Sequence, residues 1–278
     1  MKPPVDEAFA RPAVMGVVNV TPDSFSDGGE HFEPALAVRR ARELRAEGAA
    51  LVDIGGESTR PGSTGVSLDE ELRRVVPVLE ELGDVPVSID TSKAEVARRA
   101  LELGAVMVND VTALRADPDL AGVVADADAY LCLMHMLGEP RTMQDDPRYD
   151  DVVSEVAAFL EERVAVAVDA GVDEDRICVD PGIGFGKTVA HNLELLARLG
   201  EISMLGWPVV VGASRKRFLG RVLGDSEALT GPLSAALAVS VLAYQRGASI
   251  FRVHDVRPHV EALAAVHAVE EVNRSRTS

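Results

Sequence analysis

Eight short apolar segments, spread along almost the whole chain, limit its possible folds more than any other feature. They cover residues 13–20, 50–56, 85–90, 106–111, 129–135, 176–182, 208–214 and 249–254. Each is almost continuously hydrophobic and rich in β-branched residues, which is the pattern of parallel strands buried on both faces. Parallel neighbours need a long crossover between them, so the chain must travel back before each new strand.

Amphipathic segments fill the intervals between these predicted strands. "PALAVRRARELRAEG" (34–48) and "DEELRRVVPVLEELG" (69–83) carry apolar residues at helical spacing, and Gly48 and Gly83 stand where such helices should end. Strand followed by helix, eight times over, predicts a (β/α)8 TIM barrel of the α/β class. An open doubly wound sheet is the alternative. That fold usually places a glycine-rich dinucleotide loop after its first strand, whereas this chain has "NVTPDSFSDGG" there.

The chain is predicted to form one domain. It has 278 residues, 47% of them hydrophobic, which is enough for one large core. Residues 1–12 are expected to be a frayed N-terminus, residues 13–272 the barrel domain, and residues 273–278 a frayed end. No apolar run reaches the roughly 18 residues of a membrane helix, and the first residues lack the layout of a signal peptide. We therefore expect a cytoplasmic protein with no membrane partner.

Charge and cysteine content narrow the possible functions. The formal net charge of −17 disfavours a nucleic-acid partner, because phosphate backbones need clustered Lys and Arg. Cys132 and Cys178 each lie inside an apolar run, so we expect free buried thiols in a reducing compartment. "PGIGFGKT" (181–188) resembles a phosphate-binding P-loop, but Pro181 stands where that motif requires glycine. It is not interpreted as one.

Polar and ionisable residues follow nearly every predicted strand. They are Asn19, Asp53, Asp90, Asn109, Asp110, His135, Asp180, Ser214, Lys216, Arg252 and His254. A single ending of this kind is unremarkable, since Asp and Asn also cap helices. In a TIM barrel, however, the active site lies at the carboxyl ends of the strands. So many polar endings at one barrel mouth predict an active site there.

These strand-end residues divide into two chemical groups. One group offers oxygen acceptors and an amide, and consists of Asp90, Asn109 and Asp180. It suits a flat, nitrogen-rich heterocycle with N–H and NH₂ edges. The other group offers cationic donors, and consists of Lys216, Arg252 and His254. It suits phosphate or carboxylate. Together the two groups fit a nucleotide-like or pterin diphosphate.

A series of motifs on consecutive strand ends resembles the dihydropteroate synthase family across the whole chain. The motifs are "NVTPDSFSDGG", "DIGGESTRPG", "SIDT", "NDV", "LMHMLGEPRTMQ", "DPGIGFGKT", "GASRKRFLG" and "RVHD". The resemblance implies a TIM barrel, usually a homodimer, that serves folate biosynthesis and is inhibited by sulfonamides. It also implies that residues 13–272 join 7,8-dihydropterin-6-ylmethyl diphosphate to 4-aminobenzoate, with Mg²⁺, giving dihydropteroate and diphosphate.

The resemblance assigns roles residue by residue. The pterin ring would be held by Asp90, Asn109, Asp180 and Lys216. The diphosphate would be held by Asn19, Arg252 and His254, with Asn19 also near Mg²⁺. The 4-aminobenzoate would be framed by Phe25, Thr59, Arg60, Pro61, Phe185 and Ser214. The residues expected to act in catalysis are Asp90, Lys216 and Arg252.

The expected mechanism is a dissociative displacement. Diphosphate is a good leaving group and the aryl amine a weak nucleophile, so catalysis would be mainly electrostatic. Two other functions remain open, a pterin-binding methyltransferase and a pterin-binding paralogue without activity. The sequence leaves open whether His135 and Lys187 are functional or structural. It also leaves open whether residues 234–247 pack between subunits or on the barrel.

Overall fold

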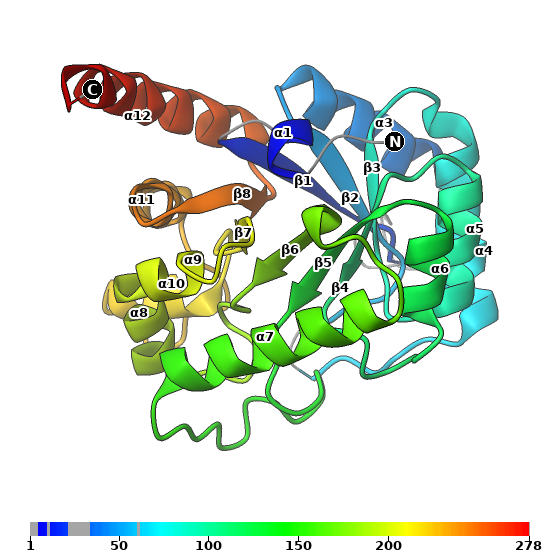
Figure 1. Ribbon diagram of the computed structural model, residues 1–278, viewed down its shortest axis with the longest axis horizontal. Coiled ribbons are helices and arrows are strands. Elements are labelled where there is room, and N and C mark those ends of the chain that lie inside the picture. The colour runs from blue at the N-terminus through cyan, green and yellow to red at the C-terminus, as the bar shows by residue number, and fades with distance from the viewer. Residues whose placement is uncertain (1–4, 10–11, 22–33, 60–61, 278) are drawn as a thin grey trace.

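The fold is a closed barrel of eight parallel strands surrounded by helices (Figure 1). The computed structural model describes residues 5–9, 12–21, 34–59 and 62–277. The strands follow one another around the barrel in sequence order and are β1 (Ala13–Asn19), β2 (Leu51–Gly55), β3 (Val87–Asp90), β4 (Met107–Asp110), β5 (Tyr130–Met134), β6 (Ile177–Asp180), β7 (Val209–Val211) and β8 (Ala248–Val253). The predicted TIM barrel is confirmed, and the open doubly wound sheet is wrong.

Helices follow the strands, as the amphipathic segments predicted. They are α3 (Pro34–Ala46), α4 (Leu68–Leu82), α5 (Ala94–Glu102), α6 (Leu120–Asp126), α7 (Val152–Asp169), α8 (Val189–Ala197), α9 (Leu199–Ser203), α10 (Arg217–Val222), α11 (Leu233–Gln245) and α12 (Val256–Thr277), with a short 3₁₀ helix at Glu174–Arg176. Gly48 and Gly83 follow α3 and α4 with φ of +106° and +63°, a region that favours glycine. Helix α12 extends beyond the barrel (Figure 1) and continues through residues 273–277, which were expected to fray.

Successive side chains of each strand point alternately into the barrel and outward against the helices. Met15, Leu51, Met107 and Ile250 belong to an apolar cluster inside the barrel, whereas their neighbours on the strands pack against the surrounding helices. The next inward position along three of these strands is polar, and the residues there are Asp53, Asn109 and Arg252. The barrel interior is therefore apolar towards the start of the strands and polar at their carboxyl ends.

The N-terminal segment packs on the barrel. Helix α1 (Val5–Ala8) lies across the front of the barrel in the view of Figure 1. Val5 and Phe9 are only 1% and 6% exposed, and the Phe9 ring meets the edge of Tyr130 at a centroid distance of 5.3 Å. The expectation of a frayed end is wrong for residues 5–9, because burying these apolar side chains offsets the entropy of ordering the segment.

The expectation of two free buried thiols is confirmed. Cys132 and Cys178 are free and buried, and they are register partners on β5 and β6.

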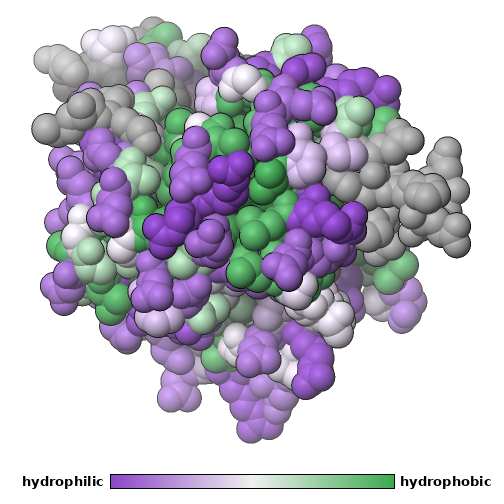
Figure 2. Space-filling model, turned by 90° about the vertical axis from the view of Figure 1, so that its right-hand side faces the viewer, coloured by the Kyte–Doolittle hydropathy of each residue, from purple (hydrophilic) through white to green (hydrophobic). Residues whose placement is uncertain are grey.

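The face formed by α4, α5 and α6 is mostly hydrophilic, with a small hydrophobic area among the charged residues (Figure 2). None of the described helices is long and apolar enough to cross a membrane.

Candidate active site

A half-buried guanidinium is the centre of a hydrogen-bonded cluster from four strands at the mouth of the barrel. Arg252 on β8 donates from Nε to Asp53 Oδ2 and from Nη2 to Asp90 Oδ2, both at 2.7 Å. Asn109 Nδ2 donates to the same oxygen of Asp53 at 3.2 Å. Asp53 is fully buried and Asp90 is 7% exposed. Removal of one partner from such a cluster leaves an uncompensated buried charge, so its members hold one another in a fixed arrangement.

These hydrogen bonds determine what the polar groups can offer a ligand. A carboxylate only accepts hydrogen bonds, so the Asn109 amide must turn its nitrogen towards Asp53 and its oxygen elsewhere. Arg252 uses Nε and Nη2, and among the described residues no acceptor lies against Nη1. Burial raises the pKa of Asp90, and the Arg252 charge opposes that rise. The cluster can therefore present an amide acceptor and one edge of a guanidinium to a ligand.

Lys216 and Asp180 lie beside this cluster. The Lys216 ammonium nitrogen is 3.8 Å from the centroid of the Phe185 ring, which is a cation–π geometry. Burial and the Arg252 charge together lower the pKa of Lys216 to about 7, although Asp180 and Asp90 oppose the change. Burial raises the pKa of Asp180, whose Oδ1 accepts the Gly182 N–H at 2.7 Å.

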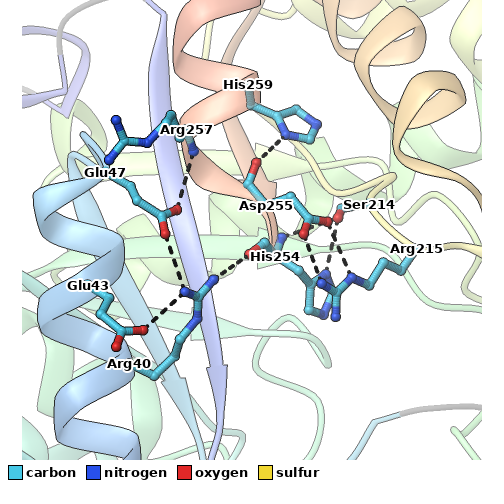
Figure 3. A network of polar contacts seen from close by, with 9 residues as sticks. All are labelled: Arg40, Glu43, Glu47, Ser214, Arg215, His254, Asp255, Arg257 and His259. Atoms are coloured by element: carbon cyan, nitrogen blue, oxygen red, sulfur yellow. Dashed lines mark hydrogen bonds and ion pairs between the residues drawn. The ribbon is translucent and has the colours of Figure 1, made fainter.

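His254 and Ser214 hold each other at the ends of β8 and β7. The Ser214 hydroxyl lies 3.2 Å from both the backbone nitrogen and Nδ1 of His254 (Figure 3). Burial, together with the charges of Arg252 and Arg215, lowers the pKa of His254 to about 3. This pKa favours a neutral imidazole in the free protein, which can still donate one hydrogen bond to an anion, so the role of His254 at the diphosphate stays a prediction.

A second layer of polar contacts fixes the backbone after β8. Arg40 on α3 donates to the His254 carbonyl oxygen at 3.1 Å and pairs with Glu47 at 3.4 Å (Figure 3). Glu47 also accepts the backbone N–H of Arg257 in α12 at 3.4 Å. Arg215, after β7, pairs with Asp255 at 2.9 Å. Helix α3, the β7 loop and the start of α12 thus meet around His254.

A cavity of about 590 Å³ opens beside Asp90, at one side of the cluster. Segments that follow β2, β3, β4 and β5 line it, and Asp90 and Thr59 are among its walls. Val111 and Met136 supply apolar surface, and Arg115 supplies a charge. Most of the other lining residues are polar or charged, Glu57, Glu71 and Arg141 among them, so the cavity suits a small molecule that makes several hydrogen bonds.

Asp110 serves the loop rather than the cavity. Its two oxygens accept the backbone N–H groups of Thr112 at 2.8 Å and Leu114 at 2.6 Å, and the Thr112 hydroxyl at 2.7 Å. In this turn Ala113 and Leu114 have φ of +51° and +65°, a conformation that non-glycine residues rarely adopt. The carboxylate therefore holds a strained turn after β4 and keeps Asn109 in place.

Comparisons with known proteins identify the family. The model of pterin binding enzymes matches residues 15–254. The dihydropteroate synthase of Escherichia coli is 46% identical over 265 residues, covering 94% of this chain and 92% of that protein. The chain belongs to the dihydropteroate synthase family.

Solved structures of the family have the same fold. The dihydropteroate synthase of Xanthomonas albilineans with 4-aminobenzoic acid has a TM-score of 0.86 at 48% identity, covering 97% of this chain and 99% of that one. The same enzyme in complex with 7,8-dihydropteroate has a TM-score of 0.84 at 46% identity, covering 96% and 99%.

The structure brings most of the predicted site residues of this synthase family together. Asp90, Asn109 and Arg252 share one hydrogen-bonded cluster, Phe185 and Lys216 are in contact, and Ser214 contacts His254, as described above. Thr59 lies on the cavity wall with Asp90. Asn19 lies at the end of β1, half-buried, in register with Gly55. Phe25, Arg60 and Pro61 lie outside the described residues.

Two kinds of residue were missing from the predicted site. Asp53 was noted only as a strand end, yet it is the acceptor that Arg252 and Asn109 share. Its position two residues after the inward-facing Leu51 was a usable signal, because alternate residues of a strand face the same side. Lys187 and His135 had no assigned role, and they form a buried hydrogen bond of 2.9 Å. No signal in the sequence paired them, since 52 positions separate them.

Proposed function

We propose that this protein condenses 7,8-dihydropterin-6-ylmethyl diphosphate with 4-aminobenzoate to give 7,8-dihydropteroate and diphosphate. The observation that carries the proposal is the meeting of acceptors and cationic donors at one barrel mouth, where Asp90 and Arg252 are in direct contact. Relatives over nearly the full chain, solved with 4-aminobenzoic acid and with 7,8-dihydropteroate, support the same reaction.

The pterin ring would lie against Asp90, Asn109, Asp180 and Lys216. The Asn109 amide oxygen, turned away from Asp53, would accept from an N–H or NH₂ of the ring, as would the carboxylates. Lys216 would donate to a ring oxygen or nitrogen. The fixed hydrogen bonds to Asp53 and Gly182 support this assignment, because they orient the acceptors before a ligand arrives.

The diphosphate would be held by Arg252, His254 and Asn19. In the described part of the chain, no group of three or more His, Cys, Asp or Glu residues could hold a metal ion. This fits a Mg²⁺ that arrives with the substrate, since Mg²⁺ keeps several waters and often binds through substrate phosphates with few protein ligands. Asn19 would supply one amide oxygen. Bound Mg²⁺ would neutralise charge on the leaving diphosphate.

The 4-aminobenzoate would lie between the β2 loop, Phe185 and Ser214, with Phe25, Arg60 and Pro61 as further contacts.

The methylene C–O bond breaks first, and its electron pair leaves with the diphosphate. The amine nitrogen then forms the C–N bond and loses one proton. Asp90 and Asp180 would favour the positive charge that develops on the pterin. The amine already has its lone pair, so no strong general base is assigned.

The enzyme is further proposed to act as a cytoplasmic homodimer. Apolar side chains are exposed on α8, α10, α11 and the segment between the last two. They are Leu193, Val222, Leu223, Leu229, Leu233 and Leu242. Apolar patches of this kind mark interaction sites, and a two-fold dimer is the commonest way to cover one. This would place the 234–247 segment at the interface.

Diphosphate release tests the reaction. With the pterin diphosphate and 4-aminobenzoate, the enzyme should release diphosphate and form dihydropteroate, and the rate should fall when Mg²⁺ is chelated. A methyltransferase would instead consume a methyltetrahydrofolate without diphosphate release. Pterin binding without either product would identify an inactive paralogue. Either of these results would reject the proposed function.

The order of binding tests the second pocket. We expect 4-aminobenzoate to bind measurably only after Mg²⁺ and diphosphate are present, because the loops after β1 and β2 are small, polar and rich in glycine. Titration calorimetry with and without Mg²⁺–diphosphate measures this directly. Phe25→Ala should weaken the second step and leave the affinity for pterin diphosphate nearly unchanged. Equal affinity in the two titrations would show that the pocket is preformed.

A further inference from the structure

The loop between β6 and α8, residues 181–188, is held by polar side chains from three directions. Asn192 Oδ1 accepts the Gly184 N–H at 2.6 Å, and Gln144 Nε2 donates to the Gly184 oxygen at 2.7 Å. Tyr149 donates its hydroxyl to the Gly186 oxygen at 2.8 Å. The backbone groups of Gly184 and the Gly186 carbonyl thus bond to side chains. These bonds hold the loop in place without regular secondary structure.

Three glycines allow the loop to follow this path. Gly182, Gly184 and Gly186 have φ of +67°, +85° and +61°. A Cβ on Gly182 would collide with the His135 carbonyl oxygen, and one on Gly186 would come within 2.7 Å of the Leu137 carbonyl oxygen. The loop is therefore pressed against the segment that follows β5, and side chains from that segment can control it.

The Lys187 side chain lies inside this contact. It is 3% exposed, and its Nζ lies 2.9 Å from His135 Nδ1 and 3.0 Å from the Phe185 carbonyl oxygen. Burial lowers the pKa of Lys187 to about 7, and burial together with Lys187 and Arg115 lowers the pKa of His135 to about 2. The imidazole is thus neutral, and its Nδ1 accepts from the ammonium.

The other face of the loop meets Lys216. The Lys216 ammonium lies 3.8 Å from the centroid of the Phe185 ring. Its side chain passes Gly184 so closely that a Cβ there would be 3.0 Å from Lys216 Cδ. The Phe185 ring and the Gly184 backbone therefore form the surface on which Lys216 lies. Lys187 donates to the Phe185 carbonyl oxygen and so holds the backbone that carries this ring.

We propose that Lys187 is a positioning residue, which together with its acceptor His135 holds the β6–α8 loop so that the Phe185 ring places the ammonium of Lys216. A lysine in a buried site without a hydrogen-bonded carboxylate costs stability rather than adding to it. It donates to one ring nitrogen and to one loop carbonyl, and these two hydrogen bonds join the loop to His135. The inference rests on the proposed role of Lys216 at the pterin, and its test separates the two.

The position of Lys216 can be measured without reference to activity. The chain has four lysines, Lys2, Lys93, Lys187 and Lys216, so ¹³C-lysine labelling gives few Cε–Hε signals. A methylene next to an ammonium over an aromatic ring has its proton signal displaced upfield by the ring current. Lys216→Met identifies the signal by its loss, and Phe185→Leu should abolish the displacement.

Lys187→Met keeps the unbranched stem and removes the donors. We expect the upfield displacement of the Lys216 signal to fall by about half or more, and kcat/KM to fall about tenfold, the factor for one lost hydrogen bond. His135→Leu removes the acceptor and should have the same effects. His135→Asn, which keeps an acceptor oxygen, should retain most of the displacement and most of the activity.

Thr188→Ala is the matched control in the same loop. It removes the hydroxyl that accepts the His191 N–H at the start of α8, at 3.2 Å, and it leaves the Lys187 contacts unchanged. It should lower stability while the Lys216 signal stays in place. A folded Lys187→Met protein with an unmoved Lys216 signal overturns the inference. So does an equal shift in Thr188→Ala, which would make the effect a general loosening.

The kinetic result then tests the proposed function separately. A moved Lys216 signal with a reduced kcat/KM supports both the positioning role and the role of Lys216 at the pterin. A moved signal with unchanged kcat/KM supports positioning and rejects Lys216 as a pterin-binding residue. If Lys187→Met does not fold, the pair His135→Leu and His135→Asn decides the question by the same two measurements.

Discussion

Asp180 shows how one carboxylate can serve the fold and a ligand at once. Its Oδ1 accepts the Gly182 N–H at 2.7 Å and begins the turn after β6. No described residue donates to its Oδ2, although Lys216 and Arg252 are near enough to affect its pKa. Burial raises that pKa, so the group gains from any donor that a ligand brings to Oδ2.

We expect Asp180→Asn to lower kcat/KM by roughly 100-fold or more, the scale on which a site built to hydrogen-bond rejects a mismatched partner. The amide oxygen must keep the Gly182 N–H, so the amide nitrogen must take the place of Oδ2. A pterin N–H or NH₂ would then face a donor. Steady-state kinetics measure the loss, and thermal unfolding should show little change. Activity near that of the original protein would mean that Asp180 only caps the turn.

At the level of elements, charged side chains hold the first residues of the β2 loop against α4 and α5. Lys93, just before α5, pairs with Glu57 in the loop and with Glu71 of α4, the latter at 2.6 Å. Arg74 of α4 donates to the Gly56 carbonyl oxygen at 2.8 Å. Glu71 is fully buried, so its pair with Lys93 belongs to the core, whereas Glu57 joins the loop to that pair.

Glu57→Gln should release the loop and leave the core pair intact. We expect KM for 4-aminobenzoate to rise about two- to fivefold, the range for one partly exposed ion pair of up to about 1 kcal/mol, with KM for the pterin diphosphate unchanged. Hydrogen exchange of the residues before α4 should also accelerate. Glu80→Gln, which removes an exposed pair with Arg99, is the control and should change neither quantity. An equal rise in both KM values would contradict a role confined to this loop.

Much of the element order could be predicted from the sequence, because buried parallel strands are continuously apolar and the helices between them are amphipathic. Alternation also predicts which strand-end residues face inward, so Asn109 reaches the site and Asp110 instead holds a turn. The pairing of Lys187 with His135 could not be predicted. Their contact depends on how two loops of different barrel units pack, and no periodicity of the chain encodes that distance.

The N-terminus shows the same limit in another form. A short segment rich in proline and charge resembles a flexible end, and only the exposed apolar end of the barrel explains why Val5 and Phe9 are buried. The sequence of the segment alone does not show that this apolar surface is there to pack against. The prediction of a frayed end therefore failed where burial against a distant part of the chain outweighed local composition.

For the whole molecule, the exposed apolar side chains of α8, α10, α11 and the segment between α10 and α11 predict self-association. Leu229 and Leu223 are 81% and 64% exposed, which a lone barrel would leave in water. We expect Leu229→Glu to convert a dimer to a monomer, because a buried unpaired charge in an interface is costly. Sedimentation velocity measures this. Leu68→Glu on α4, on the opposite side of the barrel (Figure 1), should leave the dimer intact. A monomeric unmodified protein would refute the proposed homodimer.

Buried neutral histidines should also set the acid stability of the whole molecule. Burial, together with the charges of Lys187 and Arg115, lowers the pKa of His135 from 6.5 to about 2. Between these values the unfolded chain binds a proton that the native protein does not, so stability is lost as the pH falls below 6.5. The raised pKa values of Asp90, Asp110 and Asp180 act in the opposite direction.

Comparison with His135→Asn isolates the histidine, because the three carboxylates contribute equally to both proteins and cancel in the difference. The unfolding free energy of His135→Asn relative to the unmodified protein should rise by about 1.4 kcal/mol for each pH unit lost below about 6.5. Above pH 7.5 the difference should be constant. Urea unfolding at several pH values between 4 and 8 measures both regions. A difference that does not vary with pH would mean that the His135 imidazole takes up its proton inside the folded barrel, and that the buried pair with Lys187 opens in acid.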